Sequence, residues 1–345
     1  MTEQPAPLSH QPAQTVGGFS ERELIARISA RFPSRPDWLL VGIGDDAAVV
    51  EPERNRAEVL SVDCVVDGVH FDRAFVPPDA IGHRALAVNL SDLAAMGASP
   101  RLALLSMAVP SDLPVADFDA IVDGMATLAD RHRIPVIGGN LTRTPGPLSI
   151  DVTVIGTIKR RQALTRSGAR PGDELYVTGT VGAAAAGLQR LRKSGGDASP
   201  DDAAAGRYLR PEPRLRMGIL LARNRAATAC IDTSDGLADA VHQLAGASGV
   251  GATIDADALP LDPDARDRYR TTGTIPDDVL SSDDYELLFT VRPRQRRRLE
   301  PVARQAGLAV TRIGACTSDR QVVATHTGAG RVVTSPLGGG YRHFR

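Results

Sequence analysis

The sequence repeats one unusual arrangement, in which acidic residues stand at the ends of apolar or glycine-rich runs. The first example is "VGIGDDAAVV" at residues 41–50, where Asp45 and Asp46 follow two glycines and precede alanine and valine. Burial of a carboxylate without a partner costs several kcal/mol. Such a stretch needs a compensating charge. Whether this requirement indicates a structural or a functional role depends on how often the chain repeats the arrangement.

Four further stretches place acidic residues in similar surroundings. They are "LSVDCVVDGVHF" with Asp63, "AVNLSDLAAMGA" with Asp92, "CIDTSDGL" with Asp232 and Asp235, and "SSDDYELLFTV" with Asp283 and Asp284. Asp92 continues the helical spacing of the apolar residues before it, which predicts that it lies on a core-facing stripe.

Each of these acidic residues, taken alone, also has a structural explanation. Asp235 or Ser234 can cap the helix that begins near Gly236, and Asp283 can begin a turn. Asp92 can be an ion-paired helix residue. The recurrence over five stretches is what favours a shared function.

Carboxylates that gather in one place repel one another, and a divalent cation is the usual remedy. An all-oxygen ligand set without matching Cys or His favours Mg²⁺, and Mg²⁺ held by several carboxylates most often binds polyphosphate. The residues therefore predict metal-assisted handling of a nucleotide phosphate. The chain has no GxxxxGK[ST] loop and no protein-kinase HRD or DFG set, so any ATP site belongs to another architecture.

Composition restricts the class of protein. The chain has 345 residues, which favours two domains, and its net charge of −1 argues against nucleic acid or an anionic membrane as a partner of the whole surface. Three widely spaced cysteines, Cys64, Cys230 and Cys316, form no zinc or disulfide pattern and indicate reduced thiols in the cytoplasm. No apolar run approaches the length of a membrane span.

Alternating β-rich and helical segments must position the acidic residues. Helices are expected over 20–32, which starts with a capping-box pattern, and over 78–98 and 115–133. Strands are expected in "WLLVGIGDDAAVV", "AEVLSVDCVVDGVHF", "LSIDVTVIGTI", "ELYVTGTVG", "ATACID", "YELLFTV" and "VTRIGAC". The pattern restarts after the segment 159–173. We expect a disordered tail over 1–17, an N-terminal domain over 18–157 and a C-terminal α/β domain over 158–345.

These motifs, taken in order, resemble the thiamine-monophosphate kinase family of the aminoimidazole ribonucleotide synthetase and selenophosphate synthetase superfamily. The stretches that carry the resemblance span about residues 19–344; they are "GIGDDAAVV", "SVDCVVDGVHF", "HRALAVNLSDLAAMGASP", "VIGGN", "ALTRSGARPGDELYVTGTVG", "IDTSDGLADAVHQLA", "DDYELLFTV" and "GGGYRHF". "NLSDLAAMGA" and "IDTSDGL" are highly specific in combination.

The resemblance implies a fold and an activity. The fold is a two-domain α/β (α+β) synthetase-like architecture, whose N-terminal mixed-sheet domain binds ATP and Mg²⁺ and pairs into a homodimer. The activity is ATP-dependent phosphorylation of thiamine monophosphate to thiamine diphosphate with several Mg²⁺ ions.

The resemblance also implies roles for individual residues. The expected metal ligands are Asp46, Ser61, Val62 through its carbonyl, Asp63, Asp92, Asn140, Asp232 and Asp235. The residues expected to meet ATP are Gly139, Asn140, Arg166 and Ser234, and those expected to meet thiamine monophosphate are His70, Asp283 and Tyr341. Arg166, Asp46 and Asp92 are the expected catalytic residues.

Two departures from the family pattern leave alternatives open. Asn140 stands where the family has aspartate, which predicts a weaker metal site. Ser281, Ser282 and Asp283 replace Gly-Gly-Glu, and we expect the two serines to stiffen and crowd the substrate loop. One alternative is a kinase of the same fold that acts on another acceptor, an amide or a carboxylate. Another is a nucleotide-binding homologue without catalysis.

Overall fold

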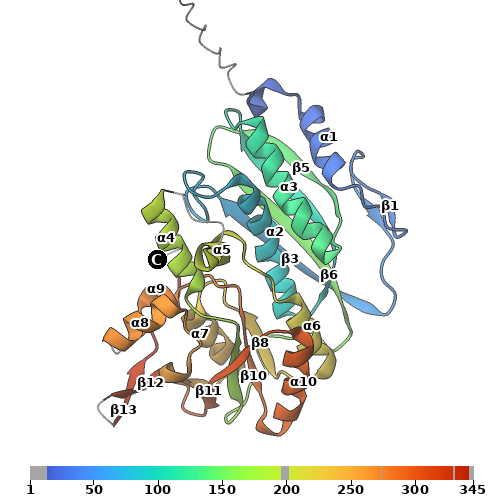
Figure 1. Ribbon diagram of the computed structural model, residues 1–345. Coiled ribbons are helices and arrows are strands. Elements are labelled where there is room, and N and C mark those ends of the chain that lie inside the picture. Colours follow the sequence, from blue (N-terminus) through green and yellow to red (C-terminus); the bar gives the residue numbers. More distant parts are fainter. Residues whose placement is uncertain (1–13, 196–201, 273, 329–330, 342–345) are drawn as a thin grey trace, which may run out of the picture.

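The protein consists of two large β-sheets with helices packed against them (Figure 1). The structure is a computed structural model that describes residues 14–195, 202–272, 274–328 and 331–341. The mixture of helices with parallel and antiparallel strands confirms the expected α/β class. No helix in the described residues is long and apolar enough to cross a membrane.

The first described residues, which begin at Gln14, are hydrogen-bonded to the rest of the domain. The Val16 backbone N–H donates to the Leu113 carbonyl at 2.8 Å, in a short 3₁₀ turn at Val16–Gly18. The Val16 side chain is buried, and this apolar contact holds the segment on the domain. The expected disordered tail over 1–17 is therefore wrong for residues 14–17. Residues 1–13 lie outside the described part of the chain.

The first helix, α1 (Glu21–Arg31), begins as its sequence predicts. The Ser20 side chain accepts the Glu23 backbone N–H at 3.3 Å, and the Glu23 carboxylate accepts the Ser20 N–H at 2.8 Å. This reciprocal pair satisfies two backbone donors that the helix itself leaves unpaired. A small hairpin of β1 (Leu39–Val41) and β2 (Val49–Val50) follows, with Asp45 and Asp46 in its loop.

The four-stranded sheet forms the centre of the N-terminal half. Its strands, in spatial order, are β3 (Arg56–Val66), β6 (Ser149–Lys159), β4 (Ser99–Pro110) and β5 (Val136–Thr144). Only β4 and β5 are parallel, which makes the sheet mixed. Alternate residues of each strand face opposite sides, so β3 turns Ser61 and Asp63 toward the helices and Leu60 and Val62 away from them.

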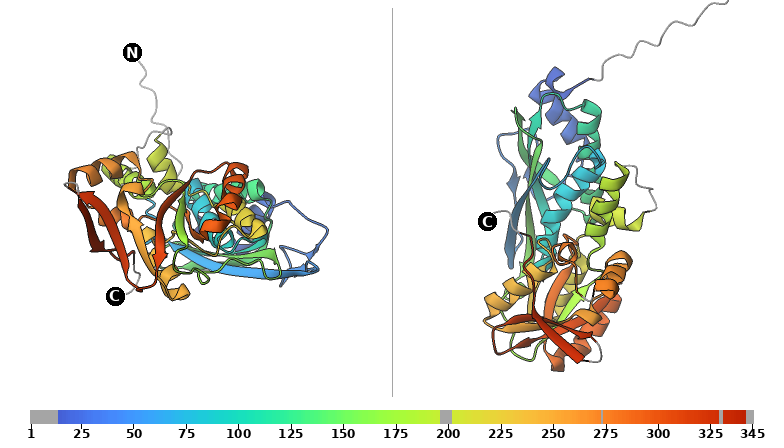
Figure 2. Two further views of the ribbon diagram at one scale, coloured as in Figure 1. Left: turned by 90° about the horizontal axis from the view of Figure 1, so that it is seen from below. Right: turned by 90° about the vertical axis from the view of Figure 1, so that its left-hand side faces the viewer.

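Helices α2 (Pro78–Ala95) and α3 (Val115–His132) cover one face of this sheet, and no helix of the described residues covers the other (Figure 2). The two helices approach unusually closely. A Cβ added to Gly82 would lie 1.7 Å from the Ile121 carbonyl oxygen, and one added to Gly124 would lie 1.9 Å from that of Asp79. Only glycine fits at either position.

The seven-stranded sheet forms the C-terminal half. Its strands, in spatial order, are β13 (Arg331–Pro336), β12 (Val322–Gly328), β9 (Gly251–Asp255), β11 (Val310–Thr317), β7 (Glu174–Thr178), β10 (Leu287–Val291) and β8 (Ala229–Asp232). The helices of this half are α4 (Ala183–Ser194), α5 (Ala203–Leu209), α6 (Leu215–Asn224), α7 (Leu237–Ser248), α8 (Pro263–Thr272), α9 (Asp277–Leu280) and α10 (Arg296–Ala306).

Helix α2 joins the two halves. It packs on the four-stranded sheet and α3, and it also contacts β8, α5 and α6 of the C-terminal half. For this reason it is buried nearly all round, including polar residues such as His83, Arg84, Asn89 and Ser91. A helix that is enclosed on every side can present functional groups to both halves of the molecule.

Candidate active site

Helix α2 meets strand β3 through polar side chains. The Ser61 hydroxyl donates to the Asp92 carboxylate, and the Asn89 side-chain oxygen accepts the Asp63 backbone N–H at 2.9 Å. Burial raises the pKa of Asp92, whereas the Ser61 hydrogen bond and the positive charge of Arg166 lower it. Helical spacing on α2 and strand alternation on β3 therefore bring Asp63 and Asp92 to one place.

Ser91, the residue of α2 next to Asp92, meets Asp232 at the end of β8. The Asp232 carboxylate is 5% exposed and accepts hydrogen bonds from Ser91 Oγ at 2.7 Å and Ser234 Oγ at 3.1 Å. Burial, followed by the negative charges of Asp92 and Asp63, raises the pKa of Asp232 to about 7. Because these charges repel one another, Asp63, Asp92 and Asp232 must lie in one region. The three predicted metal ligands come from two sheets and one helix.

These carboxylates suit a hard divalent cation, although they do not form a complete cage. Asp63, Asp92, Asp232 and the Ser61 hydroxyl offer only oxygen, the donor atom that Mg²⁺ prefers. Within the described residues, no group of three or more His, Cys, Asp or Glu side chains is arranged to hold a metal ion by itself. An ion bound here would need further oxygen ligands, from water or phosphate.

A second group of predicted residues lies around β5. Gly139 has φ +154°, and a Cβ there would lie 1.7 Å from the Leu105 carbonyl oxygen, so a side chain cannot be accommodated. Its neighbour Asn140 is exposed and pairs with Ser106 of β4. Ala48 lies close to Gly138, which places the β1–β2 loop beside the start of β5.

Asp46 belongs to that loop and is exposed. Its backbone N–H bonds to the Asp45 side chain at 2.9 Å. The structure thus brings Asp63, Asp92 and Asp232 together, and it places the loop that carries Asp46 beside Gly138.

Arg166 lies between the two large sheets in sequence and reaches the acidic region in space. Its guanidinium donates to the Gln243 side chain of α7, and its charge acts on Asp92. The Arg166 side chain is exposed, so it is accessible to a bound anion. Arg166 is therefore a cation at the rim of the cluster formed by Asp63, Asp92 and Asp232.

The predicted substrate residues fall into two places. His70 follows β3, where its Nδ1 accepts the Val66 N–H at 3.1 Å and its carbonyl accepts the Tyr208 hydroxyl at 3.4 Å. Asp283 is ion-paired with Arg84 of α2. Tyr341 is 47% exposed, and its backbone N–H donates to the Asp235 carbonyl at 3.0 Å, so it lies by the start of α7 instead.

The serines that replace the family's glycines are hydrogen-bonded. Ser282 Oγ accepts the Ala185 N–H at 3.1 Å, while the next residue but one, Asp284, accepts the N–H groups of Gly182 and Ala184 at 2.6 and 2.9 Å. Together they satisfy the free N–H groups at the start of α4. Ser281 Oγ donates to the Asp277 carbonyl at 2.8 Å. The expected stiffening of this loop has a physical basis in these bonds.

Sequence reasoning missed the buried polar residues of α2 that connect the halves. Arg84 and Ser91 are seven residues apart, so they lie on one face of the helix, and they contact Asp283 and Asp232. Tyr208 and Tyr285, whose rings pack on Arg84, were also missed. The available signal was an arginine inside the otherwise apolar run "IGHRALAVNL".

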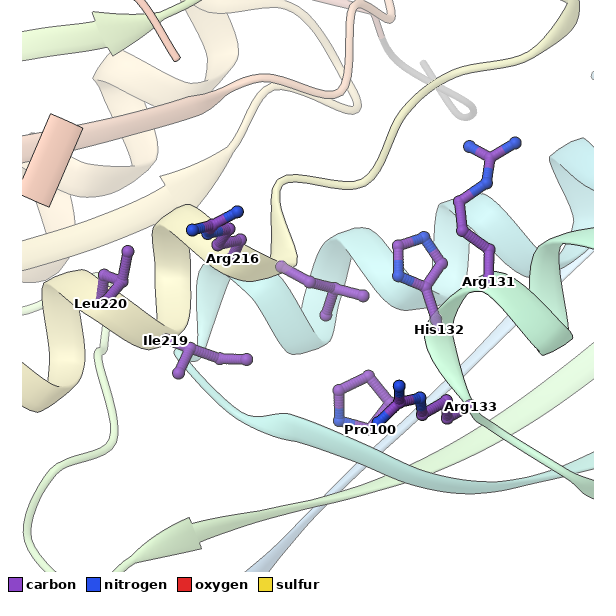
Figure 3. Close-up of a pocket in the computed structure, with 8 residues that line it drawn as sticks. Pro100, Arg131, His132, Arg133, Arg216, Ile219 and Leu220 are labelled. Carbon is purple, nitrogen blue, oxygen red and sulfur yellow. The ribbon is translucent and has the colours of Figure 1, made fainter. Parts of the chain in front are cut away.

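A separate cleft of about 320 Å³ lies where the C-terminal end of α3 meets α6 (Figure 3). It is lined by Pro100, Arg131, His132, Arg133, Leu215, Arg216, Ile219 and Leu220. None of the predicted site residues belongs to this lining. The cleft is basic, whereas the site built around α2 is acidic.

The family comparisons agree with this two-part architecture. Residues 44–158 match the family model described as AIR synthase related protein, N-terminal domain. Residues 170–327 match the model described as AIR synthase related protein, C-terminal domain. The two models together cover most of the chain.

Individual relatives extend the match over nearly the whole length. The thiamine-monophosphate kinase of Salmonella typhimurium is 40% identical over 302 residues, covering 87% of this chain and 91% of the relative. A solved thiamine-monophosphate kinase from Stenotrophomonas maltophilia is 38% identical, with a TM-score of 0.78 over 91% of this chain and 98% of that one.

A further solved structure, described as AaThiL complexed with AMPPCP and TMP, is 30% identical, with a TM-score of 0.72 over 97% of this chain and all of that one. The matches therefore include both domains, the sequence around α2 and a liganded relative. On these grounds the chain belongs to the thiamine-monophosphate kinase family.

Proposed function

We propose that this protein transfers the γ-phosphoryl group of ATP to thiamine monophosphate and forms thiamine diphosphate and ADP. The observation that carries the proposal is the convergence of Asp63, Asp92 and Asp232 where α2 meets both halves of the molecule. The relatives named thiamine-monophosphate kinase, and the AaThiL complex with AMPPCP and TMP, support the choice of nucleotide and acceptor.

The reaction is a direct in-line displacement. An oxygen of the acceptor phosphate attacks the γ-phosphorus of ATP, a new P–O–P bond forms, and the bond to the β-phosphate oxygen breaks to release ADP. The acceptor phosphate is already anionic at neutral pH, so the protein needs no strong general base. Its residues contribute by positioning the two phosphates and by offsetting their negative charge.

Mg²⁺ is the cation that this set of oxygen ligands fits, and when bound it would supply positive charge that offsets the negative charge of the phosphates. We assign the ligand role to Asp46, Ser61, the Val62 carbonyl, Asp63, Asp92, Asn140, Asp232 and Asp235. The raised pKa of buried Asp232 supports this assignment, because an uncompensated carboxylate at that position is costly.

The remaining predicted residues bind the organic ligands. We assign Gly139, Asn140, Arg166 and Ser234 to ATP, with Arg166 offsetting phosphate charge at the rim of the site. His70, Asp283 and Tyr341 are assigned to the acceptor. We also propose a cytoplasmic location, because the reaction consumes ATP.

The protein is proposed to act as a homodimer through the helix-free face of the four-stranded sheet (Figure 2). Leu60 and Val62 of β3 project from this face and are 63% and 60% exposed. The two side chains are neighbours on one face of β3, and a second copy of the same sheet would cover them.

The activity test is direct. Purified protein is incubated with ATP, Mg²⁺ and thiamine monophosphate, and thiamine diphosphate and ADP are quantified chromatographically. We expect equimolar products that require all three additions. A parallel screen with amide and carboxylate acceptors examines the altered loop at Ser281–Asp283. ADP release with one of those acceptors and none with thiamine monophosphate would reject the proposed substrate.

A further inference from the structure

Arg84 of α2 is a buried cation that contacts the loop carrying a proposed acceptor residue. It is 3% exposed, one guanidinium nitrogen donates to the Tyr208 carbonyl at 2.7 Å, and the other terminal nitrogen pairs with the Asp283 carboxylate. Its guanidinium also lies 4.7 Å from the centre of the Tyr208 ring and 5.6 Å from that of Tyr285. The side chain is thus held between two aromatic rings and one carboxylate.

These contacts hold the Arg84 guanidinium in place, and the ion pair therefore also holds the Asp283 carboxylate. A planar guanidinium between aromatic rings has little freedom to rotate, and lysine cannot reproduce the forked geometry. The Asp283 side chain is 28% exposed, so part of the carboxylate stays accessible after the ion pair has formed. The ion pair with Arg84 therefore restricts the position of the Asp283 carboxylate. It still leaves this carboxylate able to accept a further hydrogen bond.

The rest of the Asp283 loop is anchored as well. Asp284 binds the start of α4, and Glu286 pairs with Arg207 and Arg214 at 2.5 Å each. Tyr285 adopts φ +53°, a left-handed conformation that bulky residues rarely take, which the flanking anchors maintain. Asp283 is therefore a partly exposed acidic side chain in a segment whose backbone is fixed.

The same arginine leads to the second proposed acceptor residue. Tyr208, whose ring and carbonyl contact Arg84, donates its hydroxyl to the His70 carbonyl at 3.4 Å. His70 belongs to the N-terminal half and Asp283 to the C-terminal half. Arg84 and Tyr208 form a short physical connection between them.

We infer that Arg84 is a positioning residue for acceptor recognition, which sets the Asp283 carboxylate relative to His70 across the junction of the two halves. The inference rests on the proposed function, because it takes the acceptor to be a phosphate monoester whose heteroaromatic part binds between these two residues. Arg84 acts through Asp283 and Tyr208 and touches no reacting atom.

The experiment compares Arg84→Lys and Arg84→Met with a matched control. Arg210 also joins the C-terminal half to α2, through Asp79, but this ion pair is almost half exposed and lies outside the Arg84 cluster. Arg210→Met therefore removes an ion pair between the halves without touching the acceptor loop. For each variant, kcat and the KM values for thiamine monophosphate and ATP are measured together with the melting temperature.

We expect Arg84→Met to raise KM for thiamine monophosphate by about 10- to 100-fold, the size of effect for a lost charged hydrogen bond, with KM for ATP within about twofold of wild type. Arg84→Lys should recover part of the loss, and Arg210→Met should leave both KM values unchanged. Asp283→Asn should add little to the effect of Arg84→Met, because both substitutions disable one unit.

Three results would overturn the inference. They are equal increases in both KM values, a lower melting temperature with unchanged KM values, and full additivity of the Asp283→Asn and Arg84 effects. If Arg84→Met does not fold, Arg84→Lys and Asp283→Asn carry the same comparison. If the wild-type protein does not phosphorylate thiamine monophosphate, the proposed function is overturned as well. If the wild type is active but the Arg84 variants change both KM values equally, only the inference is overturned.

Discussion

At the scale of single residues, the acidic site carries a cost when no cation is bound. Asp232 is buried, it lies within the field of Asp92 and Asp63, and its carboxylate accepts hydrogen bonds from two serine hydroxyls. Natural proteins keep such carboxylates where binding of a ligand repays the unfavourable environment. The residues that make the site are therefore expected to lower the stability of the empty protein.

The pH dependence of stability follows from Asp232. Its pKa in the folded protein is raised to about 7, whereas a carboxyl in the unfolded chain ionises near pH 4. The folded state holds this proton over the interval between the two values. Asp232 therefore lowers the stability of the metal-free protein progressively from about pH 4 to pH 7, and the full cost is present above that range.

Asp232→Asn should remove this cost. In EDTA at pH 8 we expect the variant to melt about 2 to 5 °C above wild type, and this difference should shrink at pH 5. Added Mg²⁺ should raise the melting temperature of wild type but not of the variant. Asp112→Asn, on an exposed turn, is the matched control and should change nothing. A variant that is less stable than wild type at pH 8 would contradict the assigned strain.

Asn140 tests the proposed weakening of one metal site. Asn140 is exposed at β5 beside Gly139, so an added carboxylate meets no steric obstacle from a buried core. Asn140→Asp restores a charged oxygen ligand and should lower the Mg²⁺ concentration that gives half-maximal activity by about 3- to 10-fold, an effect typical of changes around metal ligands. Titration of initial rates with Mg²⁺ measures this value, and an unchanged midpoint would remove Asn140 from the ligand set.

At the scale of elements, the position of α2 depends on two glycines. Gly82 faces the backbone of α3, and Gly124 of α3 faces the backbone of α2, so the helices touch without intervening side chains. This contact fixes the depth at which α2 lies on the sheet. It consequently sets where Asp92, Ser91 and Arg84 emerge from the helix.

Gly82→Ala should force the two helices apart. The added Cβ would lie 1.7 Å from the Ile121 carbonyl oxygen, and we expect a loss of about 2 to 4 kcal/mol in the free energy of unfolding, with reduced activity. Gly246→Ala in α7 is the control, since its Cβ meets nothing within 4 Å. That control should be neutral or stabilise by up to about 1 kcal/mol. Urea denaturation measures both, and equal stabilities for the two variants would exclude the close-contact explanation.

At the scale of the whole molecule, the N-terminal half leaves one face of its β-sheet uncovered by helices. The four-stranded sheet has helices on one face only, and its open face carries Leu60 and Val62 (Figure 2). A stable dimer interface buries about 1,200 to 2,000 Å² in total, and a four-stranded sheet offers a face of suitable size. This surface is the reason for expecting a homodimer.

Leu60→Glu should convert the dimer to a monomer. The substitution adds a charge to the proposed interface on the side of β3 opposite the predicted ligands Ser61 and Asp63. Val332→Glu on β13 is the control, because Val332 is 71% exposed but belongs to the C-terminal half. Sedimentation velocity should give a dimer for wild type and Val332→Glu and a monomer for Leu60→Glu. A monomeric wild type would reject the proposed assembly.

The helices and strands were largely predictable because their signals are local. The capping box at Ser20 and Glu23 set the start of α1, and the expected helices over 78–98 and 115–133 correspond to α2 at 78–95 and α3 at 115–132. The tail was misjudged at residues 14–17, because the contact that orders Val16 comes from Leu113, which is distant in sequence. The division near residue 157 stays a prediction.

The sequence by itself determined the types of the site residues, their order along the chain and, through recurring acidic motifs, the preference for a hard cation and phosphate. Periodicity also determined which residues of α2 and β3 share a face. Only the tertiary structure decided that Asp232 meets Ser91 and that Arg84 holds Asp283. These pairings join residues that are 141 and 199 positions apart in the two cases with direct contact. Local propensity carries no information about such contacts, because they arise only when α2 is packed between two sheets.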